Sequence, residues 1–229
     1  MKVSIIIPCF NERATIEQVV QAVRASAIQN AEIIVVDDGS TDGTAELLKE
    51  KIAPSVDQII YQPRNSGKGA ALRTGIAVAS GDIILIQDAD LEYSPDDYPA
   101  LLEPILGGDA DAVFGSRFVG HRPHRVLYFW HRVGNSFLTL LSNMLTNLNL
   151  TDVEVGYKAM RTSIARELDL RENGFAVEIE MTAKLARLRC RIYEVGISYR
   201  GRTYADGKKV NWRDGFAAIY AIVRYNLFP

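Results

Sequence analysis

The chain has 229 residues, of which 48% are hydrophobic, and its 26 basic and 28 acidic residues give a formal net charge of −2. A chain of this size can bury the core of one globular domain. Its basic residues are scattered and form no basic face of the kind that nucleic-acid recognition requires. Composition therefore predicts a single domain over residues 1–229 and no nucleic-acid partner.

Cysteine content and hydropathy bear on the expected compartment. Cys9 and Cys190 lie far apart without a second pair, so neither a disulfide framework nor a zinc site is indicated. The apolar run at residues 3–7 is interrupted by Pro8 and is too short for a signal-peptide core. Residues 133–150 contain four asparagines, so no stretch reaches the roughly 18 apolar residues of a spanning helix. We expect a cytoplasmic protein that does not cross a membrane.

The first half of the chain alternates between two kinds of segment. Apolar, β-branched runs, which predict strands buried on both faces, occur at residues 3–7, 32–36, 82–86 and 112–114. Helix-like segments occur at residues 14–25, 44–51, 69–79 and 95–106. Ser94 is placed to cap the last of these helices, with Pro95 at its first position. The alternation predicts an α/β fold with a doubly wound, mostly parallel sheet and helices on both faces.

The second half has a different order of predicted elements. Its predicted elements are a long helix at 125–148, a short strand near 153–160, a helix at 176–186, a strand at 192–199 and a helix at 212–224. We expect this half to supply the site of a second substrate.

Polar side chains follow the predicted strands, at the sheet edge where doubly wound folds bind ligands. Residues i and i+2 of an extended segment point the same way, so Asp88 and Asp90 can direct two carboxylates to one point, with Glu92 as a possible third. Such a cluster suits Mg²⁺ or Mn²⁺, which usually completes its shell with water or phosphate oxygens. Taken alone, an Asp-x-Asp after a strand is more often a solvated turn.

Two further segments point to a nucleotide. Asp37 and Asp38 end a predicted buried strand, where at least one carboxylate needs a partner such as a ribose hydroxyl or a base N–H. Lys68 begins a predicted helix, where an anion is favoured, although an exposed lysine is an equal alternative. The surrounding loop is no Walker motif, because Gln62 and Gly69 stand where that motif needs Gly and Ser or Thr.

These segments resemble motifs of the family 2 glycosyltransferases with the GT-A fold, and within them the dolichyl-phosphate mannose synthase group. Residues 8–12 resemble that family's Pro-x-Tyr-Asn-Glu, with Phe10 in place of the tyrosine, and residues 37–44 resemble its Asp-Asp-Gly-Ser-x-Asp-Gly-Thr. Residues 64–69 and 87–91 resemble its Arg-Asn-x-Gly-Lys-Gly and metal motifs, although Glu92 follows where the mannose synthases often have Gln. Segments at 115–117, 134–136, 151–159 and 201–209 resemble the polyprenyl-phosphate branch.

The resemblance implies a role for each matching residue. Residues 1–116 would bind the nucleotide sugar and residues 117–229 the acceptor. The nucleotide-sugar residues would be Pro8, Phe10, Glu12, Asp37, Asp38, Lys68, Asp88, Ala89 and Lys208. The metal ligands would be Asp88, Asp90 and Glu92, and the catalytic residues Asp90 and Arg202. Arg117, Arg132 and Ser136 would hold the acceptor phosphate.

The activity that the resemblance implies is an inverting, metal-dependent transfer of a hexose, most simply mannose from GDP-mannose, to a polyprenyl or dolichyl phosphate. The acceptor phosphate would attack the anomeric carbon directly while the metal and Arg202 or Lys208 stabilise the departing diphosphate. A phosphate is already ionised near neutral pH, so we predict that His121, His124 and His131 do not act as a general base.

Residues 122–141 interleave arginines with aromatic and aliphatic side chains. This pattern suits peripheral contact with the cytoplasmic face of a membrane. A core helix with ordinary surface arginines is an equal alternative.

Three other functions remain open. The first is a hexosyltransferase that uses UDP-glucose with a polyprenyl phosphate or a soluble hydroxyl acceptor. The second is a nucleotide-sugar-binding module without catalysis, against which the presence of Asp88, Asp90 and Arg202 argues. The third is a nucleotidyltransferase, which would normally have a glycine-rich loop after the first strand, whereas residues 8–13 contain no glycine.

Overall fold

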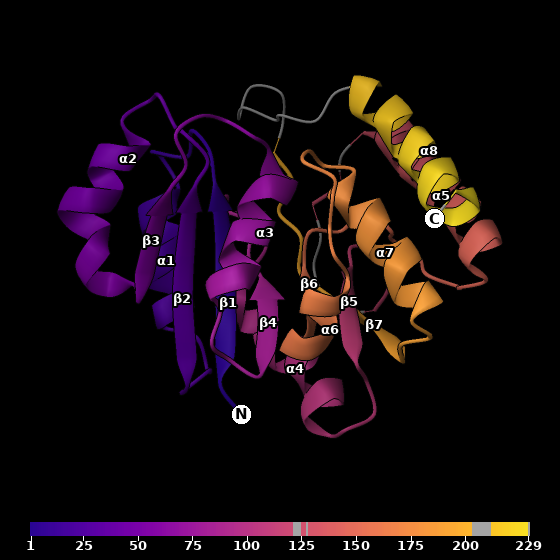
Figure 1. Cartoon of the computed structure of the whole chain (residues 1–229), viewed down its shortest axis with the longest axis horizontal. Helices are drawn as coiled ribbons and strands as arrows, with labels where there is room; N and C mark the ends of the chain where they lie inside the picture. The colour runs from indigo at the N-terminus through magenta and orange to yellow at the C-terminus, as the bar shows by residue number, and fades with distance from the viewer. Residues whose placement is uncertain (121–124, 127, 203–211, 229) are drawn as a thin grey trace.

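The computed structural model describes residues 1–120, 125–126, 128–202 and 212–228 (Figure 1). Within these ranges a seven-stranded sheet has the order β3-β2-β1-β4-β6-β5-β7. Its strands are β1 Val3–Cys9, β2 Ala31–Asp37, β3 Gln58–Tyr61, β4 Ile83–Ile86, β5 Ala112–Ser116, β6 Lys158–Arg161 and β7 Ile192–Gly196. All neighbouring pairs are parallel except those of β6, which runs antiparallel between β4 and β5.

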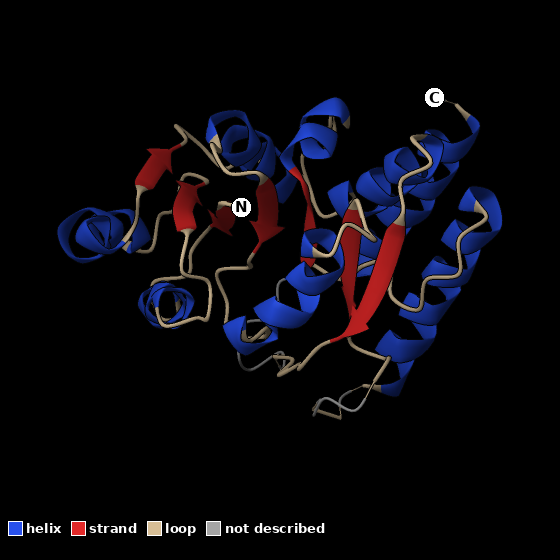
Figure 2. Ribbon diagram, turned by 90° about the horizontal axis from the view of Figure 1, so that it is seen from below, coloured by secondary structure: helices blue, strands red, loops and turns tan. Residues whose placement is uncertain are grey.

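Helices lie on both sides of this sheet (Figure 2). They are α1 Ile16–Arg24, α2 Thr44–Leu47, α3 Lys68–Val78, α4 Tyr98–Leu106, α5 Phe129–Thr146, α6 Thr162–Glu167, α7 Val177–Arg187 and α8 Trp212–Leu227. A π-helical turn, Leu48–Ile52, and a 3₁₀ turn, Ala53–Ser55, continue α2, and another 3₁₀ turn, Pro95–Asp97, precedes α4. Ser94 caps that turn, as the sequence predicts, because its hydroxyl accepts the backbone N–H of Asp96.

Apolar periodicity explains how these elements bury their side chains. Ile5 of β1 is fully buried between Ile33 of β2 and Leu85 of β4, which are also fully buried. Strands covered on both faces need such continuous apolar runs. α1 instead buries Ile16, Val19, Val20 and Val23, the one-sided spacing of an amphipathic helix.

A second, smaller apolar cluster lies between α5, α7 and α8, away from the main core of the sheet. Its members are Leu138, Val153, Ile179, Ala183, Ala218, Ala221, Ile222 and Tyr225. Figure 1 shows the three helices gathered at one end of the molecule. Among the residues that the structure describes, no helix is long and apolar enough to cross a bilayer.

The predicted α/β fold with a mostly parallel sheet is confirmed, and the differences have local causes. β3 was not predicted because it is a short edge strand whose terminal residues, Gln58 and Tyr61, are exposed. The long helix begins at Phe129 rather than residue 125, and it ends where Asn147 adopts a left-handed φ of 57°. The strand predicted near 153–160 forms only at Lys158–Arg161, and α6, which follows it, was not predicted.

Candidate active site

A cleft of about 690 Å³ lies beyond the carboxyl ends of β1, β4 and β5 and reaches α5 and α7. Its volume is in the range of small-molecule sites. Most of the predicted site residues line it, namely Pro8, Phe10, Glu12, Asp38, Lys68, Asp88, Ala89, Asp90, Glu92, Arg117, Arg132 and Arg202. Asp37 and Ser136 do not line it, and Lys208 lies outside the described residues. The parallel sheet thus brings together side chains that are nearly 200 positions apart in the sequence.

The two adjacent acids after β2 have different surroundings. The carboxylate of Asp38 accepts the backbone N–H groups of Ser66 and Gly67, at 2.9 and 2.7 Å, and so fixes the loop that leads into α3. Burial raises the pKa of Asp38 despite these two bonds. Asp37 is also buried, and its Oδ1 has no hydrogen-bond partner within the described part of the chain. Asp38 therefore has the partner that a buried carboxylate requires, from the backbone of this loop.

A chain of alternating charges runs from the cleft into the core. Lys68 Nζ lies 2.6 Å from Asp88 Oδ1 and 2.9 Å from Glu178 Oε1, and Lys158 Nζ lies 2.8 Å from Glu178 Oε2. Burial acts to lower the pKa of Lys68, but the charges of Asp88 and Glu178 outweigh it and raise that pKa. A side chain at Gly156 would meet the carboxylate of Asp88 and the ammonium group of Lys68, so it would have to displace this ion pair.

Arg202 meets several carboxylates in the same cleft. Its guanidinium lies 2.6 Å from Asp90 Oδ2, 3.2 Å from Glu12 Oε1 and 3.7 Å from Glu92 Oε1. Burial and the negative charges of Asp88 and Glu92 raise the pKa of Asp90 to about 7, against the effect of Arg202. Negative charge is therefore in excess at this point of the cleft.

The carboxylates of the cleft provide part of a coordination site for a hard divalent cation. Asp88 and Asp90 present carboxylate oxygens, the ligands that Mg²⁺ and Mn²⁺ prefer. The carboxylate of Glu92 instead accepts the backbone N–H of Arg202 at 2.7 Å and the hydroxyl of Tyr199 at 3.2 Å. Across the described ranges no group of three His, Cys, Asp or Glu side chains is arranged to hold a metal ion. Asp88 and Asp90 could hold one only with water or ligand oxygens completing its shell.

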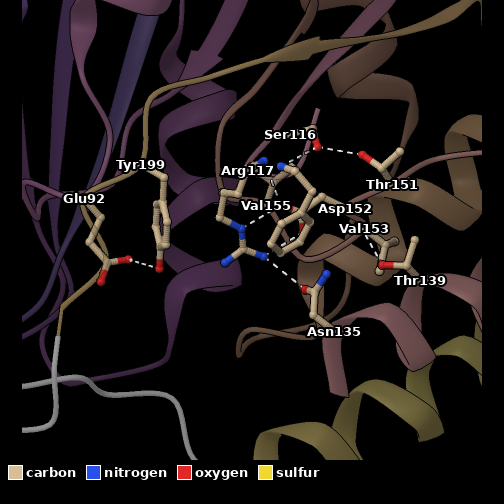
Figure 3. A network of polar contacts seen from close by, with 12 residues as sticks. Glu92, Ser116, Arg117, Asn135, Thr139, Thr151, Asp152, Val153, Val155 and Tyr199 are labelled. Carbon is tan, nitrogen blue, oxygen red and sulfur yellow. Dashed lines mark hydrogen bonds and ion pairs between the residues drawn. The ribbon is translucent and has the colours of Figure 1, made fainter. Parts of the chain in front are cut away.

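Another part of the cleft is built around Arg117 (Figure 3). Its Nε and Nη2 donate to the two carboxylate oxygens of buried Asp152, at 2.6 and 2.7 Å, and Nη2 also donates to Asn135 Oδ1 at 3.1 Å. The guanidinium lies 5.3 Å from the ring centroid of Tyr199. Arg117 is held on several sides and therefore has a fixed orientation.

Two predicted acceptor residues on α5 are placed differently. Arg132 lines the cleft and lies with its guanidinium carbon 3.6 Å from the ring centroid of Phe118. Ser136 is exposed and does not line the cleft, whereas its neighbour Asn135 is buried and does. His131 lines the cleft, while His121 and His124 lie outside the described residues.

Sequence reasoning did not single out Asn135, Lys158 or Glu178. Glu178 lies on α7 in a run, Val177–Leu185, in which two acids occur among buried neighbours. A helix that is buried almost all round and still carries acids requires counter-charges. This pattern is the sequence feature that could have indicated the ion pairs of Glu178. The counter-charges are Lys68 and Lys158, which come from distant segments.

Comparison with known proteins agrees with this geometry. Residues 4–169 match the model of Glycosyl transferase family 2. The chain is 31% identical over 216 residues to a dolichol-phosphate mannosyltransferase of Pyrococcus furiosus, a match covering 92% of the chain and 61% of that protein. It is 32% identical over 219 residues to an undecaprenyl-phosphate mannosyltransferase of Micrococcus luteus, covering 91% of the chain and 87% of that protein.

The fold is also found among solved structures. Glucosyl-3-phosphoglycerate synthase of Mycobacterium tuberculosis, in complex with Mn²⁺, UDP and glucosyl-3-phosphoglycerate, superposes with a TM-score of 0.73. It is 23% identical, and the match covers 100% of this chain and 81% of that one. The family match over most of the chain and this shared architecture lead to one assignment: the chain belongs to glycosyl transferase family 2 and has the GT-A fold.

Proposed function

We propose that this family 2 glycosyltransferase transfers a hexose, mannose from GDP-mannose in the first instance, to a polyprenyl or dolichyl phosphate with the help of Mg²⁺ or Mn²⁺. The observation that carries the proposal is that one cleft is lined both by carboxylates and by guanidinium groups. We call Asp88 and Asp90 its acidic wall and Arg117 and Arg132 its basic wall. An acidic wall suits a metal-bound diphosphate, and a basic wall suits an acceptor phosphate. The names of the Pyrococcus and Micrococcus relatives support the same pair of substrates.

The proposed reaction requires mainly that the acceptor phosphate and the sugar are positioned for attack. A phosphate oxygen of the acceptor attacks the anomeric carbon, the bond from that carbon to the nucleoside diphosphate breaks, and the configuration inverts. A divalent cation held by Asp88 and Asp90 would neutralise the departing diphosphate. Arg202 lies in the same cleft and donates to that diphosphate once it exchanges its carboxylate partners for phosphate oxygens. An ionised phosphate needs no general base.

An apolar surface on α5 and α8 supports a lipid acceptor. The two helices pack against each other, and α5 carries no acidic residue. Their exposed apolar side chains are Phe129, Trp130, Val133, Phe137, Leu140 and Met144 on α5, and Phe216, Tyr220, Val223 and Leu227 on α8. The first turn of α5 also borders the cleft through His131 and Arg132. A bilayer contacting this surface would deliver a lipid phosphate next to the basic wall.

The test of the donor side is a panel of thermal melts with GDP, GDP-mannose, UDP and UDP-glucose, each with Mn²⁺ or Mg²⁺. Ligand at a hundredfold excess over Kd adds about 2.7 kcal/mol of stability, which raises Tm by roughly 5–11 °C in a chain of this size. We expect the largest increase with the guanosine ligands. Asp88→Asn and Asp90→Asn should remove the metal-dependent part, while Asp96→Asn, which changes an exposed carboxylate outside the cleft, should retain it.

The test of the acceptor side is turnover with a short-chain polyprenyl phosphate and sedimentation with anionic vesicles. Replacing Trp130 and Phe137 by Ser should weaken vesicle binding without changing donor binding. A larger increase in Tm with UDP-glucose than with GDP-mannose would reassign the donor. Absence of transfer to any phosphate acceptor would overturn the proposed function.

A further inference from the structure

The side chain of Asn135 has a fixed orientation on the basic wall of the cleft. Asn135 belongs to α5, and its side chain points toward Arg117 (Figure 3). Its Oδ1 accepts from Arg117 Nη2 at 3.1 Å. A guanidinium can only donate hydrogen bonds, so the carbonyl oxygen, and not the amide nitrogen, must face Arg117. This contact determines where the N–H groups of the amide point.

Those N–H groups have no acceptor within the described part of the chain. Asn135 is only 7% exposed, and its Nδ2 is buried without a hydrogen-bond partner. Asn135 also lines the cleft, together with Arg117 and Arg132. A buried donor without a partner costs free energy, and native proteins retain one where a ligand or an ordered water accepts from it. The amide is therefore suited to a ligand group that only accepts hydrogen bonds.

The charges around Asn135 indicate which ligand group would accept this hydrogen bond. Asp152 already neutralises Arg117 through two hydrogen bonds, so the Arg117–Asp152 pair supplies direction rather than net positive charge. Arg132 adds a guanidinium to the same wall. An amide N–H beside two guanidinium groups is a recognition site for phosphate oxygens.

We infer that Asn135 Nδ2 donates a hydrogen bond to the phosphate monoester of the acceptor and thereby positions that phosphate for attack on the sugar. This inference rests on the proposed function, since it names a residue for the acceptor of the same reaction. The family resemblance implies Ser136 for the acceptor phosphate, and Asn135 is the neighbour of Ser136 on α5 that lines the cleft. Asparagine suits this place because its oxygen accepts from Arg117 while its nitrogen keeps N–H groups for a further acceptor.

The discriminating variant is Asn135→Asp. The new carboxylate still accepts from Arg117, but it adds a second buried negative charge beside Asp152, so Tm should fall and the kinetics are measured well below the Tm of the variant. The carboxylate has no N–H to donate, and its charge repels a phosphate, so KM for the acceptor should rise at least about tenfold. Donor KM and the Mn²⁺-dependent shift in Tm should stay within about twofold and about 1 °C of wild type. A purely structural role for Asn135 predicts an unchanged acceptor KM, which would overturn the inference.

Asn143→Asp on the same helix is the matched control. Asn143 Nδ2 donates to the carbonyl oxygen of Leu150 at 2.7 Å, and Oδ1 accepts the N–H of that residue at 3.2 Å, outside the cleft. This substitution replaces a donor by a carboxylate beside a carbonyl oxygen, so it should lower Tm. It should leave the acceptor KM unchanged. The two variants thus separate loss of stability from loss of acceptor binding.

Three phosphate probes separate this inference from the proposed function. They are a short-chain polyprenyl phosphate in detergent, 3-phosphoglycerate and inorganic phosphate as a competitor. If the wild type transfers sugar to polyprenyl phosphate and Asn135→Asp keeps the same KM, the inference fails and the function stands. If the wild type transfers only to 3-phosphoglycerate, and Asn135→Asp loses affinity for that acceptor and for inorganic phosphate, the contact of Asn135 with the acceptor phosphate stands, while attack by that phosphate and the lipid acceptor fail. If no phosphate binds to the wild type, both fail.

Discussion

The contribution of the buried ion pair of Arg117 and Asp152 to stability can be compared with that of a similar pair on the surface. Asp152 accepts from the backbone N–H, Nε and Nη2 of Arg117, at 3.2, 2.6 and 2.7 Å. Asp111 accepts from the same three groups of Arg191, at 2.9, 3.1 and 2.8 Å. The side chains of the first pair are 17% and 0% exposed, and those of the second are 56% and 22% exposed. The two pairs therefore share their geometry and differ in burial.

Asp152→Asn leaves the largely buried guanidinium of Arg117 without its ion-pair partner. Removing one partner of a buried ion pair typically costs about 3–5 kcal/mol. For a chain of 150–250 residues this corresponds to a decrease in Tm of roughly 6–20 °C. Asp111→Asn should lower Tm far less, because solvent screens the exposed pair. The loss in Asp152→Asn should also persist in 1 M NaCl, where the effect of the surface pair should largely disappear.

Thermal and urea unfolding of both variants, at low and high salt, measure these differences. Equal losses in the two variants would refute the reasoning, because burial would then have no effect on the strength of the pair. A loss in Asp152→Asn that disappears in high salt would refute it as well, since a charge in the interior is not screened in this way.

Three other variants test the remaining parts of the site and the fold. Arg202→Met should lower turnover by at least about a hundredfold, whereas Arg200→Met, which changes an exposed arginine outside the cleft, should retain it. Glu178→Gln removes the counter-charge of buried Lys158 and should lower the urea midpoint, and adding Lys158→Met should recover part of the loss. Burial acts to raise the pKa of Glu32, but hydrogen bonds from Ser4, Ser80 and Lys2 outweigh it and lower that pKa from 4.5 to about 2. Glu32→Gln should therefore lower stability at pH 7, and its difference from wild type should shrink as the pH falls from 4.5 toward 2.

The parallel part of the sheet and one wall of the site could be predicted from the sequence. Buried parallel strands have continuous apolar runs, and their carboxyl ends meet at one edge, so Asp38, Asp88 and Asp90 were expected together there. β6 could be expected as a strand, but its insertion between β4 and β5 in the opposite direction could not. That order depends on long-range packing, for which a single sequence gives no local signal.

The ion-pair partners of the charged residues also could not be predicted from the sequence. Lys68 was expected to contact a nucleotide or solvent, and in the structure it lies between Asp88 and Glu178. Ion pairs of this kind join segments about 20 and 110 positions away from Lys68. Neither separation matches the period of a helix or a strand, so the sequence does not pair these residues and only the fold brings them together.

The orientation of α5 could not be predicted from helical periodicity. The usual rule turns the apolar face of a helix toward the core, yet α5 buries Asn135, Leu138, Thr139 and Ser142, and exposes a stripe that includes Phe129, Trp130 and Phe137. Polar contacts fix the rotation of the helix: Asn135 accepts from Arg117, and the hydroxyl of Thr139 accepts the backbone N–H of Val153. Ser136 is one residue, about 100° around the helix, from Asn135, and this rotation directs it away from the cleft. α5 therefore turns polar side chains inward together with Leu138, and its exposed apolar stripe is available to a second apolar environment.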